Sequence, residues 1–141
     1  MKIYLDNCCF NRPFDDQKQL KIRLETEAKL HIQRQIMLGE VELIWSYILE
    51  LENNHNPDIE IRYSIHGWKK LASYFCVENE EIIAYAEGLQ RLGIKPHDAL
   101  HVSCARYAKA DYFITTDNKL INKKMDDIPI VNPLFFIGLE D

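Results

Sequence analysis

The sequence predicts an α/β fold, a three-layer sandwich in which a central parallel β-sheet has helices on both faces. Three observations predict it. Short apolar segments rich in β-branched and aromatic residues recur, segments with helical spacing of apolar residues alternate with them, and the 141-residue length suits one domain. Because parallel strands need long crossover connections, this alternation favours a parallel sheet. We therefore expect residues 1–141 to form a single domain.

Five segments are expected to be the strands. Each is a short apolar run bounded by polar or turn-forming residues, and the first run ends directly before Asp6 and Asn7. The predicted strands are residues 2–5, 41–45, 74–77, 111–115 and 128–131.

The helices expected between the strands rest on apolar spacing and on residues that suit helix ends. Ser46 and Asn79 suit N-caps, Pro96 suits a first turn, and Gly39 and Gly93 suit helix stops. We interpret the apolar stripe of the first helix mainly as core, and otherwise as a homodimer contact or a contact for a partner helix. The predicted helices are residues 15–38, 46–52, 57–74, 79–93, 96–108 and 120–125.

The composition excludes several classes of protein. A hydrophobic content of 47% is too high for a disordered chain, and no run approaches the ~20 apolar residues of a membrane span. Asp6 interrupts the apolar start too early for a signal peptide, so we expect a cytoplasmic protein with no membrane contact. A net charge of −5 excludes coating of nucleic acid by bulk electrostatics. The cysteines form no C-x-x-C pair and are expected to be reduced core thiols: Cys8, Cys9, Cys76 and Cys104.

Four acidic residues stand where parallel sheets bind ligands, beyond the carboxyl ends of the strands. Asp6 follows the first predicted strand, Asp117 follows the fourth, and Glu52 lies on the helix after the second. Asp98 is in the first turn of its helix, on the stripe that should face the sheet. We therefore expect the four carboxylates to converge on one rim.

Converging carboxylates cannot all stay ionised without compensation, because each raises the pKa of the others. A divalent cation is the usual compensation, and a set of oxygen ligands favours Mg²⁺ or Mn²⁺. Such an ion lowers the pKa of a bound water and neutralises charge on a scissile phosphate, which is the chemistry of phosphodiester hydrolysis. Simpler interpretations stay open: Asp98 could complement its helix dipole, Asp6 and Asp117 could form turns, and Glu52 could face water.

Four segments contain the acidic residues in a characteristic order and spacing. The segments are Ile3-Tyr4-Leu5-Asp6-Asn7-Cys8, then Trp45-Ser46 with Glu52 six residues after the serine, then Asp98-Ala99-Leu100-His101-Val102 with Ala105, and Phe113-Ile114-Thr115-Thr116-Asp117. Together they resemble the PIN-domain family, which includes the VapC-type ribonuclease toxins of bacterial toxin–antitoxin pairs. The resemblance runs from the first residues to at least Asp117.

The resemblance implies a Rossmann-like sandwich and an endoribonuclease that depends on Mg²⁺ or Mn²⁺. It implies catalytic and metal-binding roles for Asp6, Glu52, Asp98 and Asp117, with Asn7 beside the first of them and with Thr116 or Thr115 orienting the cluster. It also implies RNA as the substrate and an antitoxin protein as a partner. Many relatives carry a further acid where this chain has Asn118 and Lys119, so a second metal ion would be held weakly or only once RNA is bound.

Other residues near these motifs have two interpretations each. Arg12 could contact a substrate phosphate or form a surface salt bridge. The lysines after Asp117 could attract RNA or form a solvated helix face: Lys119, Lys123 and Lys124. The histidines that flank the motifs could act as a general acid, but they have no zinc-type spacing and a metal-bound water can do the acid–base work, so we interpret them as structural or solvent-facing: His55, His97 and His101.

Three functions stay open. The leading hypothesis is a metal-dependent endoribonuclease, either the toxin of a toxin–antitoxin pair or a housekeeping nuclease. The alternative is a catalytically weak PIN-like module that binds a metal or a partner protein. A phosphatase with an aspartate nucleophile would need a second acid two residues after Asp6, where this chain has Cys8.

Overall fold

The computed structural model describes residues 1–123 and 125–139, and it forms one five-stranded sheet. All strand pairs are parallel, in the order β3-β2-β1-β4-β5. The predicted parallel sheet is therefore confirmed, although the fifth strand is two residues shorter than expected. The strands are β1 Lys2–Leu5, β2 Glu42–Ser46, β3 Tyr74–Cys76, β4 Tyr112–Ile114 and β5 Ile130–Val131.

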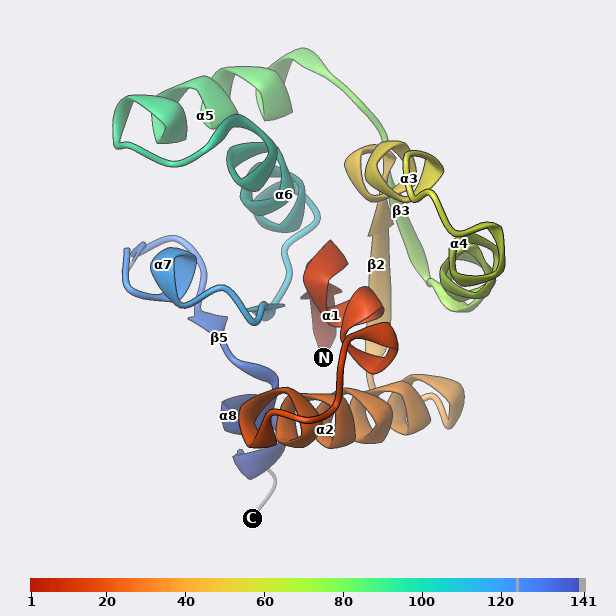
Figure 1. Ribbon diagram of the computed structural model, residues 1–141. Coiled ribbons are helices and arrows are strands. Elements are labelled where there is room, and N and C mark those ends of the chain that lie inside the picture. The colour runs from red at the N-terminus through yellow and green to blue at the C-terminus, as the bar shows by residue number, and fades with distance from the viewer. Residues whose placement is uncertain (124, 140–141) are drawn as a thin grey trace.

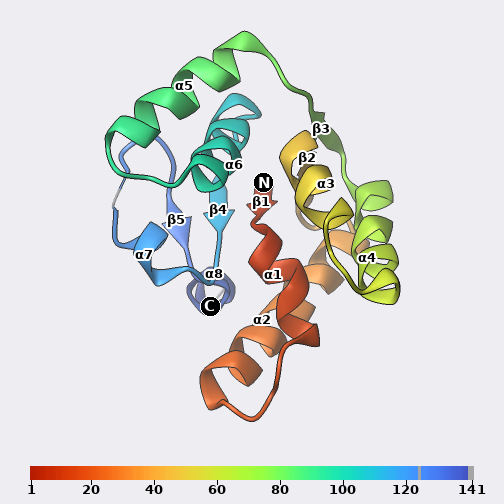
Figure 2. The ribbon, with the colours of Figure 1, turned by 45° about the horizontal axis from the view of Figure 1, so that its top comes forward.

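Helices cover both faces of the sheet, as predicted. Helices α2 and α8 lie on one side, and α5 and α6 lie on the other (Figures 1 and 2). None of the described helices is both long and apolar enough to cross a membrane. The described helices are α1 Asn7–Asn11, α2 Leu20–Met37, α3 Tyr47–Asn54, α4 Ile59–His66, α5 Glu80–Arg91, α6 Pro96–Tyr107, α7 Asn118–Ile121 and α8 Pro133–Gly138, with 3-10 turns at Arg12–Phe14 and Gly67–Leu71.

Two short helices were not predicted. Helix α1 begins directly after β1 because the Asp6 carboxylate accepts a hydrogen bond from the Asn7 backbone N–H at 2.8 Å and caps the helix. Helix α8 has the same kind of start, since the Asn132 side chain accepts from the Leu134 N–H at 2.8 Å. Both helices are shorter than two full turns, too short for apolar periodicity to be read from the sequence.

Three predicted helices differ at their bounds. Helix α2 begins at Leu20, not at residue 15, because the Gln17 amide donates to the backbone oxygens of Arg12 and Asp15 and holds a turn there. The predicted helix 57–74 is divided into α4 and a 3-10 turn, and it ends before Ala72. The predicted helix 120–125 is observed as α7, and Lys124 within it lies outside the described residues. The expected domain 1–141 likewise includes residues 124, 140 and 141, which are not described.

The core lies on both faces of the sheet. Ile3, Tyr4 and Leu5 in the central strand are completely buried, because neighbouring strands flank β1 and helices cover it from both sides. Each buried side chain of this size contributes about 1.5–3 kcal/mol by leaving water. The stripe of α2 is only partly core, since Ala28 and Ile32 are buried whereas Leu24 is exposed.

Strand β1 lies at the point where the strand order reverses. From β1 the chain adds β2 and β3 toward one edge and then β4 and β5 toward the other. In such sheets the crevice at the carboxyl ends of the two strands beside this point binds ligands. The backbone N–H of Asp6 donates to the carbonyl of Ile114 at 2.9 Å, which keeps the exits of β1 and β4 adjacent. The residues that follow these two strands therefore meet at one crevice.

Candidate metal centre

Asp6 lies at the exit of β1 and is 94% buried, with 6% of its surface exposed. Its Oδ1 accepts from the Asn7 backbone N–H, and its Oδ2 accepts from the Thr115 hydroxyl at 2.9 Å. The Cys8 thiol also lies 3.6 Å from Oδ2. These donors hold the carboxylate in one orientation.

Thr115 joins the exits of the two central strands. Its completely buried hydroxyl donates to Asp6 Oδ2 and accepts from the Asp117 backbone N–H at 3.1 Å. The sequence interpretation left open whether Thr115 or Thr116 orients the acids. Thr116 has a different contact, because its hydroxyl accepts from the Arg12 guanidinium at 2.7 Å.

Glu52 reaches the same crevice from α3 and meets His101 of α6. His101 Nε2 is hydrogen-bonded to Glu52 Oε1 and lies 3.8 Å from Asp6 Oδ1. One ligand atom from each of Asp6, Glu52 and His101 lies within 4.8 Å of the other two. The structure therefore brings two of the four expected acids into direct contact with a histidine.

The charges of this group are coupled. Burial raises the pKa of Glu52, but the hydrogen bond and charge of His101 together lower it by more, so the pKa lies below its ordinary value. Burial lowers the pKa of His101, but the hydrogen bond to Glu52 and the charges of Asp6 and Asp98 raise it above its ordinary value. Each of the two groups therefore favours the charged form of the other.

Asp98 and Asp117 line a neighbouring cavity of about 170 Å³ at the same rim. Burial raises the pKa of Asp98, and the negative charges of Asp6 and Asp117 raise it further. The four expected acids are thus close enough for their charges to interact. The same cavity is also lined by three lysines: Lys95, Lys119 and Lys123.

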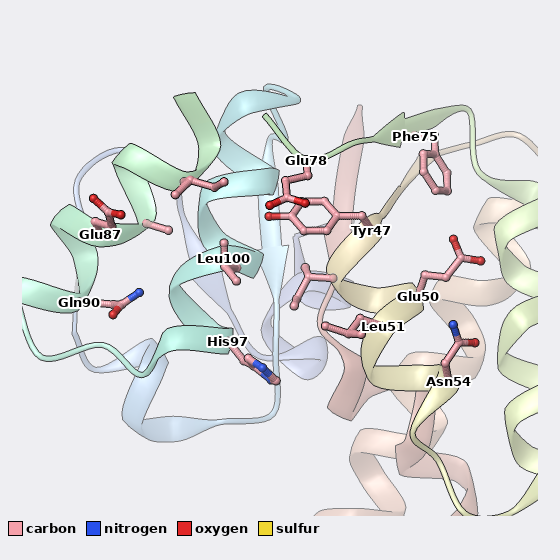
Figure 3. Close-up of a pocket in the computed structure, with 13 residues that line it drawn as sticks. Tyr47, Glu50, Leu51, Asn54, Phe75, Glu78, Glu87, Gln90, His97 and Leu100 are labelled. Atoms are coloured by element: carbon pink, nitrogen blue, oxygen red, sulfur yellow. The ribbon is translucent and has the colours of Figure 1, made fainter. Parts of the chain in front are cut away.

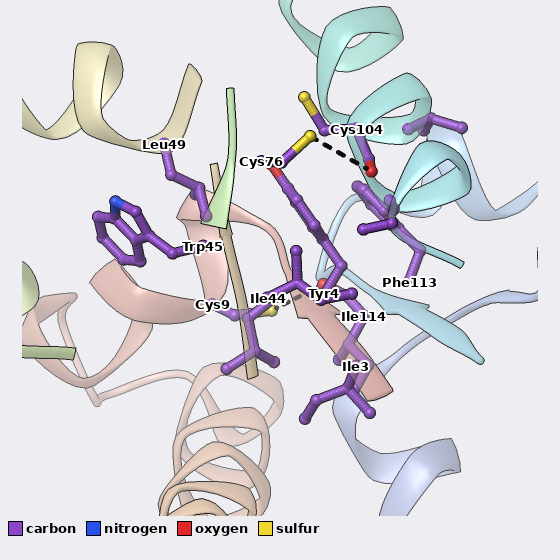
Figure 4. Close-up of a cluster of buried hydrophobic side chains, with 14 of the residues drawn as sticks. Ile3, Tyr4, Cys9, Ile44, Trp45, Leu49, Cys76, Cys104, Phe113 and Ile114 are labelled. Carbon is purple, nitrogen blue, oxygen red and sulfur yellow. Dashed lines mark hydrogen bonds between the residues drawn. The ribbon is translucent and has the colours of Figure 1, made fainter. Parts of the chain in front are cut away.

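His101 owes its position to the core. The Tyr4 hydroxyl lies 2.6 Å from His101 Nδ1 and 2.6 Å from Ser46 Oγ, below the acids. The Tyr4 ring lies within the buried cluster and is stacked on Phe113 with the ring centroids 5.2 Å apart (Figure 4). Burial raises the pKa of Tyr4 well above its ordinary value, so its hydroxyl stays protonated. This fixed phenol directs Nε2 of the imidazole toward Glu52 and Asp6.

Arg12 is occupied by protein partners. Its Nε lies 3.3 Å from the fully buried carboxylate of Glu25, and its two terminal nitrogens donate to Asp15 and Thr116. Four-fifths of its side chain is buried. The guanidinium therefore ties the turn after α1 to α2 and to the exit of β4.

An open groove of about 700 Å³ adjoins the acids. It runs between α3 and the helices α5 and α6 (Figure 3). Glu50, Glu78 and Glu87 line it, and no lysine or arginine stands among its described lining residues. His97, on its wall, lies with Nδ1 3.4 Å from Glu52 Oε2. The groove thus touches the cluster, but its charge is unfavourable for a polyanion.

The donor set fits a divalent cation. The four carboxylates outnumber the buried imidazole, His101, and burial raises the pKa of Asp98, which the negative charges of Asp6 and Asp117 raise further. The side-chain oxygen of Asn7, next to Asp6, is buried without a hydrogen-bond partner among the described residues. Oxygen donors of this kind, with one imidazole, are ordinary ligands of divalent metals.

Sequence reasoning did not include His101 in the cluster. The signal that points to it is its position three residues after Asp98, which places both on one face of α6. Its burial and its distance from Glu52 follow only from the packing of α3 against α6.

Comparisons with known proteins show the fold. No family model matches the chain, and no curated protein matches its sequence. Solved structures match it over nearly its whole length, among them FitAcB from Neisseria gonorrhoeae, with a TM-score of 0.61 at 17% identity over 94% of this chain and 98% of that chain. VapBC2 from Rickettsia felis, bound to a promoter DNA fragment, gives a TM-score of 0.61 at 14% identity over 94% and 98%. VapBC-1 from nontypeable Haemophilus influenzae gives 0.56 at 16% identity over 95% and 99%. The likeness confirms the fold implied by the resemblance to VapC-type PIN domains.

Proposed function

We propose that the protein is a metal-dependent endoribonuclease that hydrolyses RNA phosphodiester bonds, with Mg²⁺ or Mn²⁺ held by Asp6, Glu52, Asp98 and Asp117. The observation that carries the proposal is the gathering of the buried carboxylate of Asp6 and the half-buried carboxylates of Glu52, Asp98 and Asp117 at the crevice between β1 and β4, where burial and then the acidic neighbours raise the pKa of Asp98. The shared fold with FitAcB and VapBC chains supports it.

The side chains have separate tasks in this proposal. A bound divalent ion supplies neutralisation of the scissile phosphate and a lowered pKa for the attacking water. Thr115 fixes the position of the Asp6 carboxylate relative to the start of α7 through its two hydrogen bonds. Asp98 and Asp117 add negative charge on the side of the smaller cavity.

RNA would approach along the lysine side of the rim. Lys95, Lys119 and Lys123 line the cavity that contains Asp98 and Asp117, so phosphate groups meet positive charge there. The groove on the other side is lined by Glu78, by Glu87 and by Glu50, which is paired with Lys69, so it offers a polyanion less positive charge than the lysine side. This asymmetry supports a substrate-binding role for Lys119, whereas the buried ion pair of Arg12 supports a structural role.

A protein partner is part of the proposal. The matched structures are FitAcB and VapBC assemblies, and the resemblance to VapC-type toxins implies an antitoxin. An antitoxin that covers the rim would silence the nuclease. A homodimer and a cytoplasmic location remain predictions.

The test compares cleavage of structured RNAs by the wild-type protein and by Asp98→Asn. We expect cleavage with Mn²⁺ or Mg²⁺, none with EDTA, and a loss of at least 100-fold in the variant, whose folding is checked by circular dichroism. Glu87→Gln is the matched control, because Glu87 lines the acidic groove away from the cluster. Equal cleavage by Asp98→Asn and wild type would refute the proposal.

The second candidate is a weakly catalytic module that binds a metal or a partner. The acidic groove of about 700 Å³ favours it, because such a surface suits a basic protein segment better than RNA. Metal binding without cleavage of any RNA would favour this candidate.

A further inference from the structure

His101 places a nitrogen donor among the carboxylates of the rim. It is 99% buried, with 1% of its surface exposed, and its Nε2 faces both Glu52 Oε1 and Asp6 Oδ1. A buried imidazole directed into a set of carboxylates can serve them as a hydrogen-bond donor or serve a cation as a ligand. The two roles need opposite protonation of Nε2.

The hydrogen bonds at Nδ1 allow His101 to act as a metal ligand through Nε2. With the proton on Nδ1, the ring donates to the Tyr4 oxygen, and Tyr4 in turn donates to Ser46 Oγ. Nε2 then offers its lone pair to the crevice. Histidines that bind metals ordinarily donate their other ring N–H in this way, which fixes the tautomer and the ring orientation.

The distances are close to those of a ligand set. Ligand atoms that are each about 2.1 Å from one ion lie up to about 4.2 Å apart. The donor atoms of Asp6, Glu52 and His101 are all within 4.8 Å of one another. Small side-chain movements therefore bring all three to a single ion.

We propose that His101 Nε2 is a direct ligand of the cation at this centre, and that the site consequently selects a first-row transition ion such as Mn²⁺ over Mg²⁺. The inference rests on the proposed metal centre and specifies one of its ligands and the ion that it prefers. Mg²⁺ strongly prefers oxygen ligands, whereas transition ions accept imidazole readily. A site made only of carboxylates would lack this basis for discrimination.

Pulsed electron paramagnetic resonance of Mn²⁺ bound to the wild-type protein tests the ligand directly. We expect ¹⁴N modulation from a coordinated imidazole, replaced by the ¹⁵N pattern when histidine is ¹⁵N-labelled. Wild-type protein suffices for this measurement, so it does not depend on how a variant folds. Bound Mn²⁺ without nitrogen coupling would overturn this inference and leave the proposed nuclease standing. Failure to bind Mn²⁺ would overturn this inference, and failure to bind Mg²⁺ as well would overturn the proposed nuclease.

Two variants identify which histidine is coupled. His97→Gln is the matched control, because His97 also lies near Glu52 but 60% of its side chain is exposed. We expect the nitrogen coupling to survive in His97→Gln and to disappear in His101→Gln. The reverse pattern would overturn the inference.

Titration calorimetry measures the selectivity of the site for Mn²⁺ over Mg²⁺. We expect His101→Gln to lose on the order of 10- to 100-fold or more in Mn²⁺ affinity, with a change below about threefold for Mg²⁺. A histidine that only orients Glu52 would weaken both ions by the same factor. Equal losses for the two ions would therefore overturn the inference.

Discussion

The Thr115 hydroxyl lies 2.9 Å from Asp6 Oδ2, although 109 positions separate the two residues in the chain. This hydrogen bond crosses the point where the strand order reverses, and it connects the end of β4 to the first acid of the centre. Because Thr115 also accepts from the Asp117 N–H, one buried hydroxyl positions residues at both strand exits.

Thr115→Val should weaken metal binding. The change keeps the shape of the side chain but removes the donor to Asp6, and loss of such a supporting contact typically costs about 10- to 100-fold in metal affinity. Mn²⁺ titration calorimetry measures the loss. Thr115→Ser keeps the hydroxyl and should bind Mn²⁺ like wild type. Undiminished affinity in Thr115→Val would mean that Asp6 does not need this hydrogen bond.

Tyr4→Phe should destabilise the fold. It removes the hydroxyl that lies 2.6 Å from both Ser46 Oγ and His101 Nδ1, and a buried polar group left without its partner costs about 1–3 kcal/mol. Urea unfolding measures the free energy of unfolding. Tyr112→Phe serves as the control, because Tyr112 is only partly buried and is remote from the cluster in the adjacent strand. Equal stability of Tyr4→Phe and wild type would contradict the described hydrogen bonds.

Arg12→Ala should destabilise the protein by about 3–5 kcal/mol, because it leaves the fully buried carboxylate of Glu25 without its cation. The double variant Arg12→Ala with Glu25→Gln removes the unpaired charge and should recover part of this loss. Urea unfolding of the single and double variants measures both. If Arg12→Ala lowers RNA affinity but leaves stability unchanged, Arg12 is a substrate contact instead.

Lys29 should make the stability depend on pH. The residue is 98% buried, its amine lies near the rings of Phe10 and Trp68, and burial lowers its pKa from 10.5 to about 7. Between these values the unfolded chain binds more protons than the folded one. Stability should therefore rise with pH across this window, by up to about 1.4 kcal/mol per pH unit.

Lys29→Met should lack this rise. Between pH 7.0 and 9.5, the free energy of unfolding measured in urea should rise with pH less in Lys29→Met than in wild type. Lys21→Met is the matched control on the same helix, because Lys21 is exposed. A parallel pH dependence in Lys29→Met and wild type would show that Lys29 is not the group responsible.

The local signals of the sequence were sufficient for most of the fold. All five predicted strands form, because each is a short apolar run between turn-forming residues. The capped start of α5 at Asn79 and the proline start of α6 at Pro96 are also where local chemistry puts them. The start of α2 at Leu20 could not be predicted from the sequence, because it depends on hydrogen bonds of the Gln17 amide to the backbone of the preceding turn.

The candidate site was only partly visible in the sequence. Asp6 and Asp117 follow strands, so a parallel sheet alone brings them to one rim. His101 could not be assigned in the same way, because its role depends on Tyr4 beneath it and Glu52 opposite it, which come from different elements. Arg12 was interpreted as a substrate contact or a surface salt bridge, and only the fold reveals the buried Glu25 beside it.

The sequence by itself determined the five strands, most of the longer helices, the all-parallel sheet and the acids available at its carboxyl end, because periodicity, capping and strand exits act over a few residues. Only the tertiary structure decided which of these side chains meet: Glu52 with His101, Thr115 with Asp6, and Arg12 with Glu25. Such pairs depend on strand order and helix packing. Contacts between residues far apart in the chain form only when the whole sheet and its covering helices assemble together.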